Sequence, residues 1–457
     1  MQSNASLYYG LSLLTLLSPM SELLANEAEI DSLSSYEIYA GAKGYYYHKL
    51  TPFNAPHNDA DDARVFIGLK YNSLINQNVF FDTDVRAVYQ YRNGLNPLDE
   101  ERASFLEVKK FKLVFENVFD SPYWKAEVGR KRIASRNSWL YDDEIEFIEF
   151  SRQSTLLELK GFYAKWLWDG RFGAGFNALD DEQRIETSGS SYLGLDINYT
   201  WYYQHKFLIS YLFEDFNNPR VDEQTFSTST FVESSRLNWL RLALHGAQSN
   251  ATNTFEYWLD VAFLRGKRDL AYLIDETSFK KQSIKLGKAL RLGIKWFPDE
   301  SNFSLMAAFD TGSGDTQFKQ DSNLFVQPYI ASNRTRLLGR QKRRMYGEVL
   351  APRLSNLSVY SFATAYQFSP ENWLELAAYK YQQNKAESIS FQYRDNLLPN
   401  GQSKEIGWGV DLSWFKEFRN DLLVETTVGF FHTGDAFNQL VEKKNAHRIY
   451  LNLIKRW

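Results

Sequence analysis

Alternation of apolar and polar residues recurs along most of the chain and constrains its fold more than any other feature. From Val79 to Tyr91 the odd-numbered positions are mostly apolar, whereas the even-numbered positions include Asp82, Asp84 and Arg86. Successive side chains of a β-strand point to opposite sides, so a period of two predicts strands with one apolar and one charged face. The same alternation is found at Leu193–Trp201, Phe207–Phe213, Tyr257–Phe263, Leu290–Trp296, Phe303–Phe309 and Glu405–Trp414.

These strands predict a transmembrane barrel. We expect about 18 of them, each about ten residues or longer, which is the length that a tilted strand needs to cross a bilayer. Beyond residue 25 no run of apolar residues is long enough for a transmembrane helix. Backbone groups in lipid must all be paired, so such a sheet has to close. The fold class is therefore all-β, a single antiparallel barrel whose charged face lines a water-filled lumen.

The aromatic content agrees with a membrane barrel. The chain has 28 Tyr, 34 Phe and 12 Trp, yet its mean hydropathy is polar at −0.44. Tyr and Trp combine an apolar ring with a polar tip and form girdles at the two membrane interfaces of a barrel. The net charge of −4 does not indicate a nucleic-acid partner, and the absence of cysteine excludes disulfides and thiolate zinc sites.

The first residues indicate export from the cytoplasm. The apolar run Leu7–Leu17 is too short to span a bilayer and is followed by Ser18 and Pro19, as in the core of a signal peptide. No Lys or Arg precedes it, so a disordered start is the alternative. We expect residues 1–25 to be a signal peptide and residues 26–457 to be the barrel, located in the outer membrane of a Gram-negative bacterium.

Irregular regions separate some of the predicted strands. The short connections 298–302 and 369–372 resemble periplasmic turns. The longer regions are candidate extracellular loops or lumen constrictions, and they cover residues 50–63, 216–235, 265–283, 310–355 and 383–404.

Signals for catalysis are weak. The six His residues stand apart, and no metalloprotease, nucleophile-elbow, phosphate-loop or dinucleotide motif is present. The acidic clusters 142–144 and 180–182 could form a hydrolase pair or a calcium site, but carboxylates of turns or of the lumen are the simpler interpretation. A barrel-embedded hydrolase would also need a nucleophile with a nearby base, and none can be named. We therefore predict no enzyme, no metal site and no cofactor.

Basic residues are concentrated in two places. Six cations lie between residues 334 and 344, and a second group, with Arg130, Arg132 and Arg136, precedes the acidic cluster at 142–144. Arginine binds carboxylates with two parallel hydrogen bonds, and a ring of cations at a constriction would pass anions and repel cations. Alternatively, the cluster at 334–344 lies on an extracellular loop, where it binds lipopolysaccharide phosphates or nothing.

At these clusters the sequence resembles the alginate-export family of outer-membrane porins. The resemblance is carried by residues 129–146, by 332–336 with Gly339, 346–348 and 354–357, and by 429–437. It implies an 18-stranded, monomeric barrel with an arginine-lined constriction for a uronic-acid polymer. The implied pathway residues are Arg132, Arg334, Arg336, Arg343 and Arg344, and the implied acidic partners are Asp142, Asp143 and Glu348. The chain departs from the family pattern after Arg132, where Ala134 and Ser135 replace a further arginine and acid.

Two channel functions remain open from the sequence. The first is an anion-selective channel for an anionic polysaccharide or oligosaccharide, for which we expect periplasmic secretion partners. The second is a general diffusion or uptake porin for oligosaccharides or small anions, because the many rings could stack on sugars. Both place the chain in contact with outer-membrane lipid and lipopolysaccharide.

Overall fold

Eighteen long antiparallel strands form one closed barrel, as the alternation predicted. The structure is a computed structural model that describes residues 34–48, 50, 59–93, 101–168, 171–172, 190–202, 204–217, 231–250, 252–272, 278–299, 301–315, 321–387 and 399–457. The predicted signal peptide lies outside these residues. The long strands are β1 (Ser34–His48), β2 (Ala60–Asn76), β3 (Val79–Asn93), β4 (Glu101–Glu116), β5 (Trp124–Ala134), β6 (Asp142–Gln153), β7 (Leu157–Lys165), β9 (Ser191–Tyr202), β10 (His205–Asn217), β11 (Phe231–Ser249), β12 (Asn253–Tyr272), β13 (Ser278–Pro298), β14 (Phe303–Gly312), β18 (Leu357–Ser369), β19 (Asn372–Gln383), β20 (Glu405–Glu417), β21 (Leu422–Thr433) and β22 (Asn445–Arg456).

Short elements complete the described part of the chain. Two-residue strands extend the sheet, and a separate two-stranded hairpin lies inside the barrel. These elements are η1 (Val118–Asp120), η2 (Arg136–Ser138), η3 (Asp435–Phe437), β8 (Arg171–Phe172), β15 (Asp321–Ser322), β16 (Arg334–Arg336) and β17 (Lys342–Arg344). Among the described residues no helix has the length and apolar character needed to cross a membrane.

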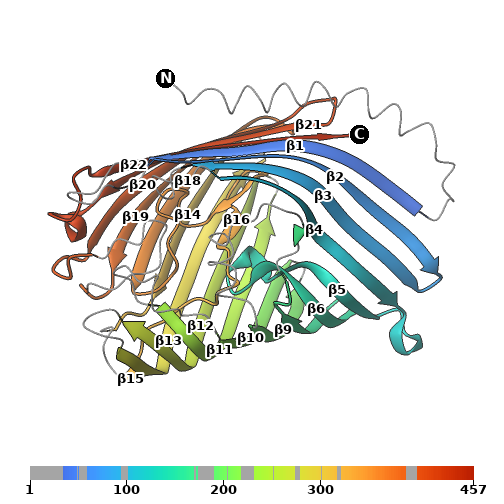
Figure 1. Cartoon of the computed structure of the whole chain (residues 1–457), viewed down its shortest axis with the longest axis horizontal. Coiled ribbons are helices and arrows are strands. Elements are labelled where there is room, and N and C mark those ends of the chain that lie inside the picture. The colour runs from blue at the N-terminus through green and yellow to red at the C-terminus, as the bar shows by residue number, and fades with distance from the viewer. Residues whose placement is uncertain are drawn as a thin grey trace.

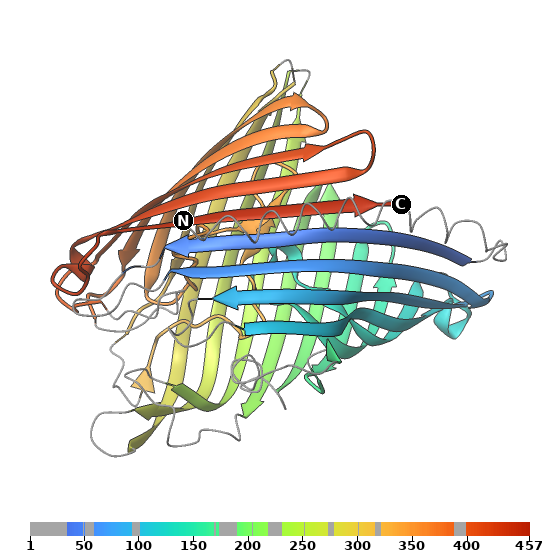
Figure 2. The same cartoon turned by 45° about the horizontal axis from the view of Figure 1, so that its top comes forward.

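The barrel closes where the first and last strands meet. Strand β1 pairs antiparallel with β22 in a ladder that runs from Tyr39 opposite Arg456 to His48 opposite His447, and the two strands lie side by side in Figure 2. Each other long strand pairs with its neighbours in the sequence, β7 pairing directly with β9. Closure leaves no open sheet edge, which is what a spanning sheet requires in lipid.

Side chains alternate between the interior and the outer surface. On β12, Ala262 and Leu264 point inward and are buried, whereas Leu259 points outward and is 42 % exposed. Many large apolar side chains on the outside are exposed in the same way, including Ile148, Phe150, Leu195 and Ile294. This apolar outer band is the surface that faces lipid.

The two ends of the barrel have different connections. At one end the turns are short, such as Gln77 and Asn78 between β2 and β3, and the predicted turns at 298–302 and 369–372 also lie at this end. Longer connections lie at the other end. Barrels of this class have short periplasmic turns and long extracellular loops, so the long-loop end is extracellular.

The prediction of an irregular region at 265–283 was wrong. Strand β12 continues to Tyr272 and β13 begins at Ser278, so this pair of strands extends well beyond most others. The ladder continues through a register shift next to Gly266, whose φ of 155° is unfavourable for residues with a Cβ. The glycine therefore allows both strands to continue past the register shift.

Part of the interior is packed, so protein occupies part of the lumen that we expected to be water-filled. Residues 313–315 and 321–356 belong to the connection between β14 and β18, and we call these described residues the internal segment. Its hairpin lies within the ring of strands (Figure 1). Trp139 after η2 and Phe325 in the segment are fully buried and stack on each other, with ring centroids 6.3 Å apart. Trp239 Nε1 of β11 donates to the carbonyl of Val326 at 2.8 Å. Described residues of the region predicted at 310–355 thus lie inside the barrel and pack against its wall.

Candidate functional site

Arg132 of β5, an implied pathway arginine, forms an ion pair with Asp142 of β6, one of the implied acidic partners. Arg132 Nη2 donates to Asp142 Oδ2 at 2.6 Å, and the guanidinium remains 43 % exposed while the carboxylate is buried. Ser332 of the internal segment also donates to Asp142. Asp143 next to it is half-buried and accepts the backbone N–H of Glu144 at 2.8 Å. The carboxylate of Asp142 thus holds both an exposed arginine and the internal segment.

The predicted arginines of the hairpin point in different directions. Strand alternation places Lys342 and Arg344 on one face of β17 and Arg343 on the other. Arg343 is buried, and its Nε lies 3.0 Å from Glu375 Oε1 on β19. Glu375 also accepts the backbone N–H groups of Leu338 and Gly339. The structure therefore places Arg343 in an anchor of the hairpin, whereas Arg344 is half-buried.

Glu348 lies at the centre of a second anchor. It is buried, its Oε2 lies 2.8 Å from Arg448 Nη1 on β22, and its Oε1 accepts the backbone N–H of Arg344 at 2.9 Å. Burial alone would raise the pKa of Glu348, but Arg448, Arg344 and Arg334 outweigh burial and lower it to about 2. The predicted acidic partner is therefore ionised, and its strongest cationic neighbour is an arginine that sequence reasoning missed.

Arg334 faces the wall formed by the first strands. Lys43 on β1 interacts electrostatically with Arg334, Arg86 and Lys109. Arg86 pairs with Glu107, and Lys109 lies 2.5 Å from Glu144. Within the described ranges, no carboxylate lies within 4.0 Å of the charged groups of Lys43 and Arg334. Lys43, which Glu425 also attracts, and Arg334 are therefore cations without an ion-pair partner among the described carboxylates.

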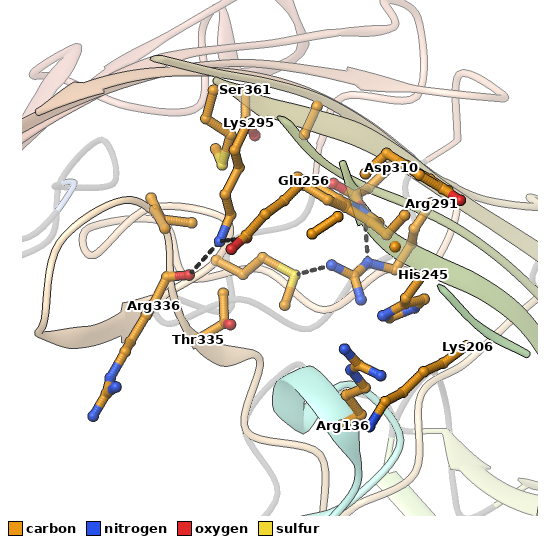
Figure 3. A pocket seen from close by; sticks show the side chains of 18 of the residues that line it. Arg136, Lys206, His245, Glu256, Arg291, Lys295, Asp310, Thr335, Arg336 and Ser361 are labelled. Atoms are coloured by element: carbon orange, nitrogen blue, oxygen red, sulfur yellow. Dashed lines mark hydrogen bonds and ion pairs between the residues drawn. The ribbon is translucent and has the colours of Figure 1, made fainter. Parts of the chain in front are cut away.

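A cavity of about 360 Å³ lies on the opposite side of the hairpin, against β10 to β14 (Figure 3). Lys206 and Arg136 extend toward each other on one side, and Lys295 reaches Glu256 at 3.4 Å on the other. The polar residues lining the cavity also include Arg291, Asp310, His245, Thr335, Arg336 and Ser361.

Three of the cavity cations lack a carboxylate partner. In the part of the chain that the structure describes, none lies within 4.0 Å of the charged groups of Lys206, Arg136 or Arg336. Arg136 and Arg336 are exposed, and Lys206 is half-buried. Burial, followed by repulsion from Arg241, lowers the pKa of Arg136. Lys206 and Arg136 can therefore offer their hydrogen-bond donors to an anion at the cavity, whereas the Arg336 side chain points away from them (Figure 3).

The cavity cations rest on a buried charge network. Arg241 on β11 and His245 both contact Asp260 on β12 at 2.9 Å, and Arg291 on β13 lies 2.6 Å from Asp310 on β14. The guanidinium groups of Arg241 and Arg291 lie over the Trp139 ring, at 5.6 and 5.0 Å from its centroid. A buried cation and carboxylate satisfy each other, so these arginines are structural supports rather than free charges.

Sequence reasoning missed Lys43, Lys206, Lys295, Arg291 and Arg448. Each stands singly on an alternating strand, so only its position on the polar face could have identified it. The acidic cluster at 180–182 lies outside the described residues. Among those that are described, no group of three or more His, Asp or Glu side chains could hold a metal ion.

Comparison with known proteins places the chain in a family. A sequence model described as alginate export matches residues 58–451. The chain belongs to the alginate export family. Two curated relatives are the alginate production protein AlgE of Pseudomonas aeruginosa and that of Pseudomonas syringae pv. tomato. The first is 23 % identical over 391 residues, covering 80 % of this chain and 77 % of the relative; the second is 22 % identical over 401 residues, covering 78 % and 77 %.

Solved outer-membrane proteins share the fold of this alginate export family member. OpdK of Pseudomonas aeruginosa has a TM-score of 0.54 at 10 % identity, covering 93 % of this chain and 99 % of its own. OccK2 of the same organism, solved in complex with glucuronate, has a TM-score of 0.54 at 11 % identity, with coverages of 92 % and 98 %. The chain is thus an integral outer-membrane barrel of the channel type.

Proposed function

We propose that this barrel is a passive, anion-selective channel, and not an enzyme, that passes an alginate-like polyuronate. The observation that carries the proposal is the set of interior cations without carboxylate partners among the described residues, namely Lys206 and Arg136 at the cavity, Arg334 and Arg336 on the hairpin, and Lys43 on β1. A polyuronate carries one carboxylate on each sugar, and cations spaced along a constriction would bind successive carboxylates in turn.

Family membership supports the same substrate class, since both curated relatives are alginate production proteins. In this proposal Arg132, Arg334, Arg336 and Arg344 line the pathway together with Lys206 and Arg136. Arg343, Asp142, Asp143 and Glu348 have a different role, which is to hold the hairpin and its neighbours in place. A monomeric state and periplasmic secretion partners remain predictions.

The alternative is a porin that takes up small anions or oligosaccharides. It is favoured by the packed interior, because a cavity of about 360 Å³ is at the lower end of the range for small-molecule sites, about 300–1,000 Å³. The structural relative OccK2, which has been solved with glucuronate, provides an example of a similar fold with a single uronate. The two functions differ in whether a polymer can enter the constriction.

The deciding experiment measures single-channel current of the refolded protein in a planar bilayer under a KCl gradient. We expect anion selectivity and block by polyuronate, but no block by neutral maltooligosaccharide. Block by monomeric uronate but not by the polymer would favour the uptake porin. A cation-selective pore that is indifferent to polyuronate would overturn both.

The variants compare two cations in the interior of the barrel with one cation on its outer surface. Replacing Lys206 and Arg136 with Gln removes two charges at the cavity and should weaken both selectivity and block. Replacing Lys380 with Gln removes an outward cation that is 49 % exposed and pairs with Glu405, and it should change neither.

A further inference from the structure

The outer surface of β11, β12 and β13 carries a group of cations at the extracellular end of the apolar band. Outward positions nearer the short-turn end of these strands are apolar and include Leu240, Leu259 and Leu292, each about two-fifths exposed. Beyond them the outward positions carry charge, except that the neutral Asn238 lies between Leu240 and Arg236. The charged residues are Arg236, Arg265, Lys267 and Lys288, all exposed, and we call these four residues the outer cation strip.

Strand pairing brings the members of the strip together. Arg236 on β11 is opposite Lys267 on β12, and Lys288 on β13 is opposite Phe263, two residues before Arg265. Residues opposite each other in an antiparallel ladder have Cβ atoms about 4.5–5.5 Å apart, and diagonal neighbours lie within reach of long side chains. The four cations can therefore converge on one ligand. Figure 1 shows these three strands side by side.

The positive charge of the strip is only partly balanced. Arg236 Nε lies 3.3 Å from Asp215 Oδ1, but the two side chains are 76 % and 38 % exposed, so this pair is weak. Asp269, beyond Lys267, accepts a hydrogen bond from Ser234 at 3.0 Å. In the described ranges, no carboxylate lies within 4.0 Å of the charged groups of Arg265, Lys267 or Lys288.

The position of the strip relative to the apolar band indicates which layer of the membrane it contacts. The outward apolar residues of β12 run from Phe255 to Phe263, which is about 26 Å along the strand at about 3.3 Å per residue. Allowing for strand tilt, this distance covers most of a hydrocarbon band about 25 Å tall. Arg265 and Lys267 follow at once, so they lie at the level of the outer headgroups.

We propose that the outer cation strip binds the phosphate groups of a lipid in the outer leaflet, such as the phosphorylated sugar headgroup of lipopolysaccharide. Arginine can bind phosphate oxygens with two parallel hydrogen bonds, and lysine contributes a compact positive charge. The acyl chains of the lipid would lie along the apolar band below, against Leu240 and Phe263. This site is on the outside of the barrel and does not depend on the channel function.

The test uses the full-length protein in detergent and fluorescently labelled lipopolysaccharide as the probe. A variant with Arg265→Gln, Lys267→Gln and Lys288→Gln should bind the lipid at least tenfold more weakly than the unmodified protein. The matched control carries Lys380→Gln, Lys443→Gln and Lys444→Gln, which removes three exposed cations elsewhere, and should bind within twofold. Heat-modifiable migration on gels verifies that both variants are folded.

Two further arms separate the sources of phosphate. Enzymatically dephosphorylated lipopolysaccharide should bind the unmodified protein as weakly as the intact lipid binds the strip variant. Inorganic phosphate at millimolar concentration should compete only slightly, because it lacks acyl chains. The proposal is overturned if the strip variant binds like the control, if dephosphorylated lipid binds as well as intact lipid, or if inorganic phosphate displaces the lipid completely.

Discussion

Glu348 of the internal segment and Arg448 of the last strand form a buried ion pair, with 2.8 Å between Oε2 and Nη1. The pair joins two parts of the chain that are 100 residues apart in sequence. Asp411 on β20 strengthens this attachment, because its carboxylate accepts the backbone N–H of Glu348 at 2.9 Å. The position of the hairpin in the lumen is thus fixed by charges on the barrel wall.

Glu348→Gln should destabilise the protein by about 3 kcal/mol, because removing one partner leaves the other charge of a buried pair poorly compensated. Urea unfolding in detergent, followed by tryptophan fluorescence, measures this change. Glu405→Gln is the control, since the pair of Glu405 with Lys380 is exposed and should contribute less than about 1 kcal/mol. Equal effects of the two substitutions would contradict the anchor.

The same pair has a defined pH dependence. Because the pKa of Glu348 is lowered from 4.5 to about 2 in the folded protein, its stabilising contribution is complete above pH 4.5 and is lost as the pH falls toward 2. The stability difference between the unmodified protein and Glu348→Gln should therefore shrink as the pH falls from 4.5 toward 2. A difference that stays unchanged down to pH 2.5 would rule out an ionised Glu348 held by arginines.

Arg336→Gln should change ion selectivity, whereas Arg343→Gln should change stability. Arg336 is exposed, so its loss should lower the ratio of anion to cation permeability by roughly two- to fivefold, as one charge in water-like surroundings contributes about 1 kcal/mol or less. Arg343 is buried with Glu375, so its loss should reduce stability and increase current noise. Reversal potentials and urea unfolding of both variants test this division, which fails if both change only selectivity.

Trp139→Ala should cost about 3–5 kcal/mol, since the indole is fully buried beneath Arg241 and Arg291 and stacks on Phe325. It should also raise the single-channel conductance, because the void opens toward the lumen. Trp408→Ala is the matched control on the lipid face, where the side chain is 44 % exposed, and should cost less and leave conductance unchanged. An unchanged conductance in Trp139→Ala would indicate that the packed interior does not limit the current.

Gly129→Ala should destabilise the barrel, whereas Gly44→Ala should not. Gly129 has a φ of 134°, and an added Cβ would lie 2.2 Å from the carbonyl oxygen of Phe111. At Gly44 the nearest atom, the carbonyl oxygen of Asp62, would be 3.6 Å away, an ordinary contact. We expect a loss of about 1–3 kcal/mol for Gly129→Ala from backbone strain, with unfolding in urea as the readout. Equal stability of the two variants would show that the strand relaxes freely at Gly129.

The sequence predicted the barrel well because strand alternation is a local property. The period of two at Val79–Tyr91 and Glu405–Trp414 appears in β3 and β20. The ion pair of Arg132 with Asp142 was not predicted, although the two residues come from neighbouring strands. The interior was harder to predict. Arg343 is buried because it pairs with Glu375, a residue of another strand. In the sequence the cluster from 334 to 344 is uniformly basic, and only the hairpin places alternate residues on opposite faces.

The link between Glu348 and Arg448 has a consequence for the order of assembly. The internal segment is synthesised well before β22, yet its buried carboxylate meets its strongest cationic neighbour only when that last strand has paired with β1 and β21. Completion of the ring and final seating of the segment are therefore one coupled step. A chain that ends before β22 would lack both the strand pairing with β1 that closes the barrel and Arg448, the partner of Glu348.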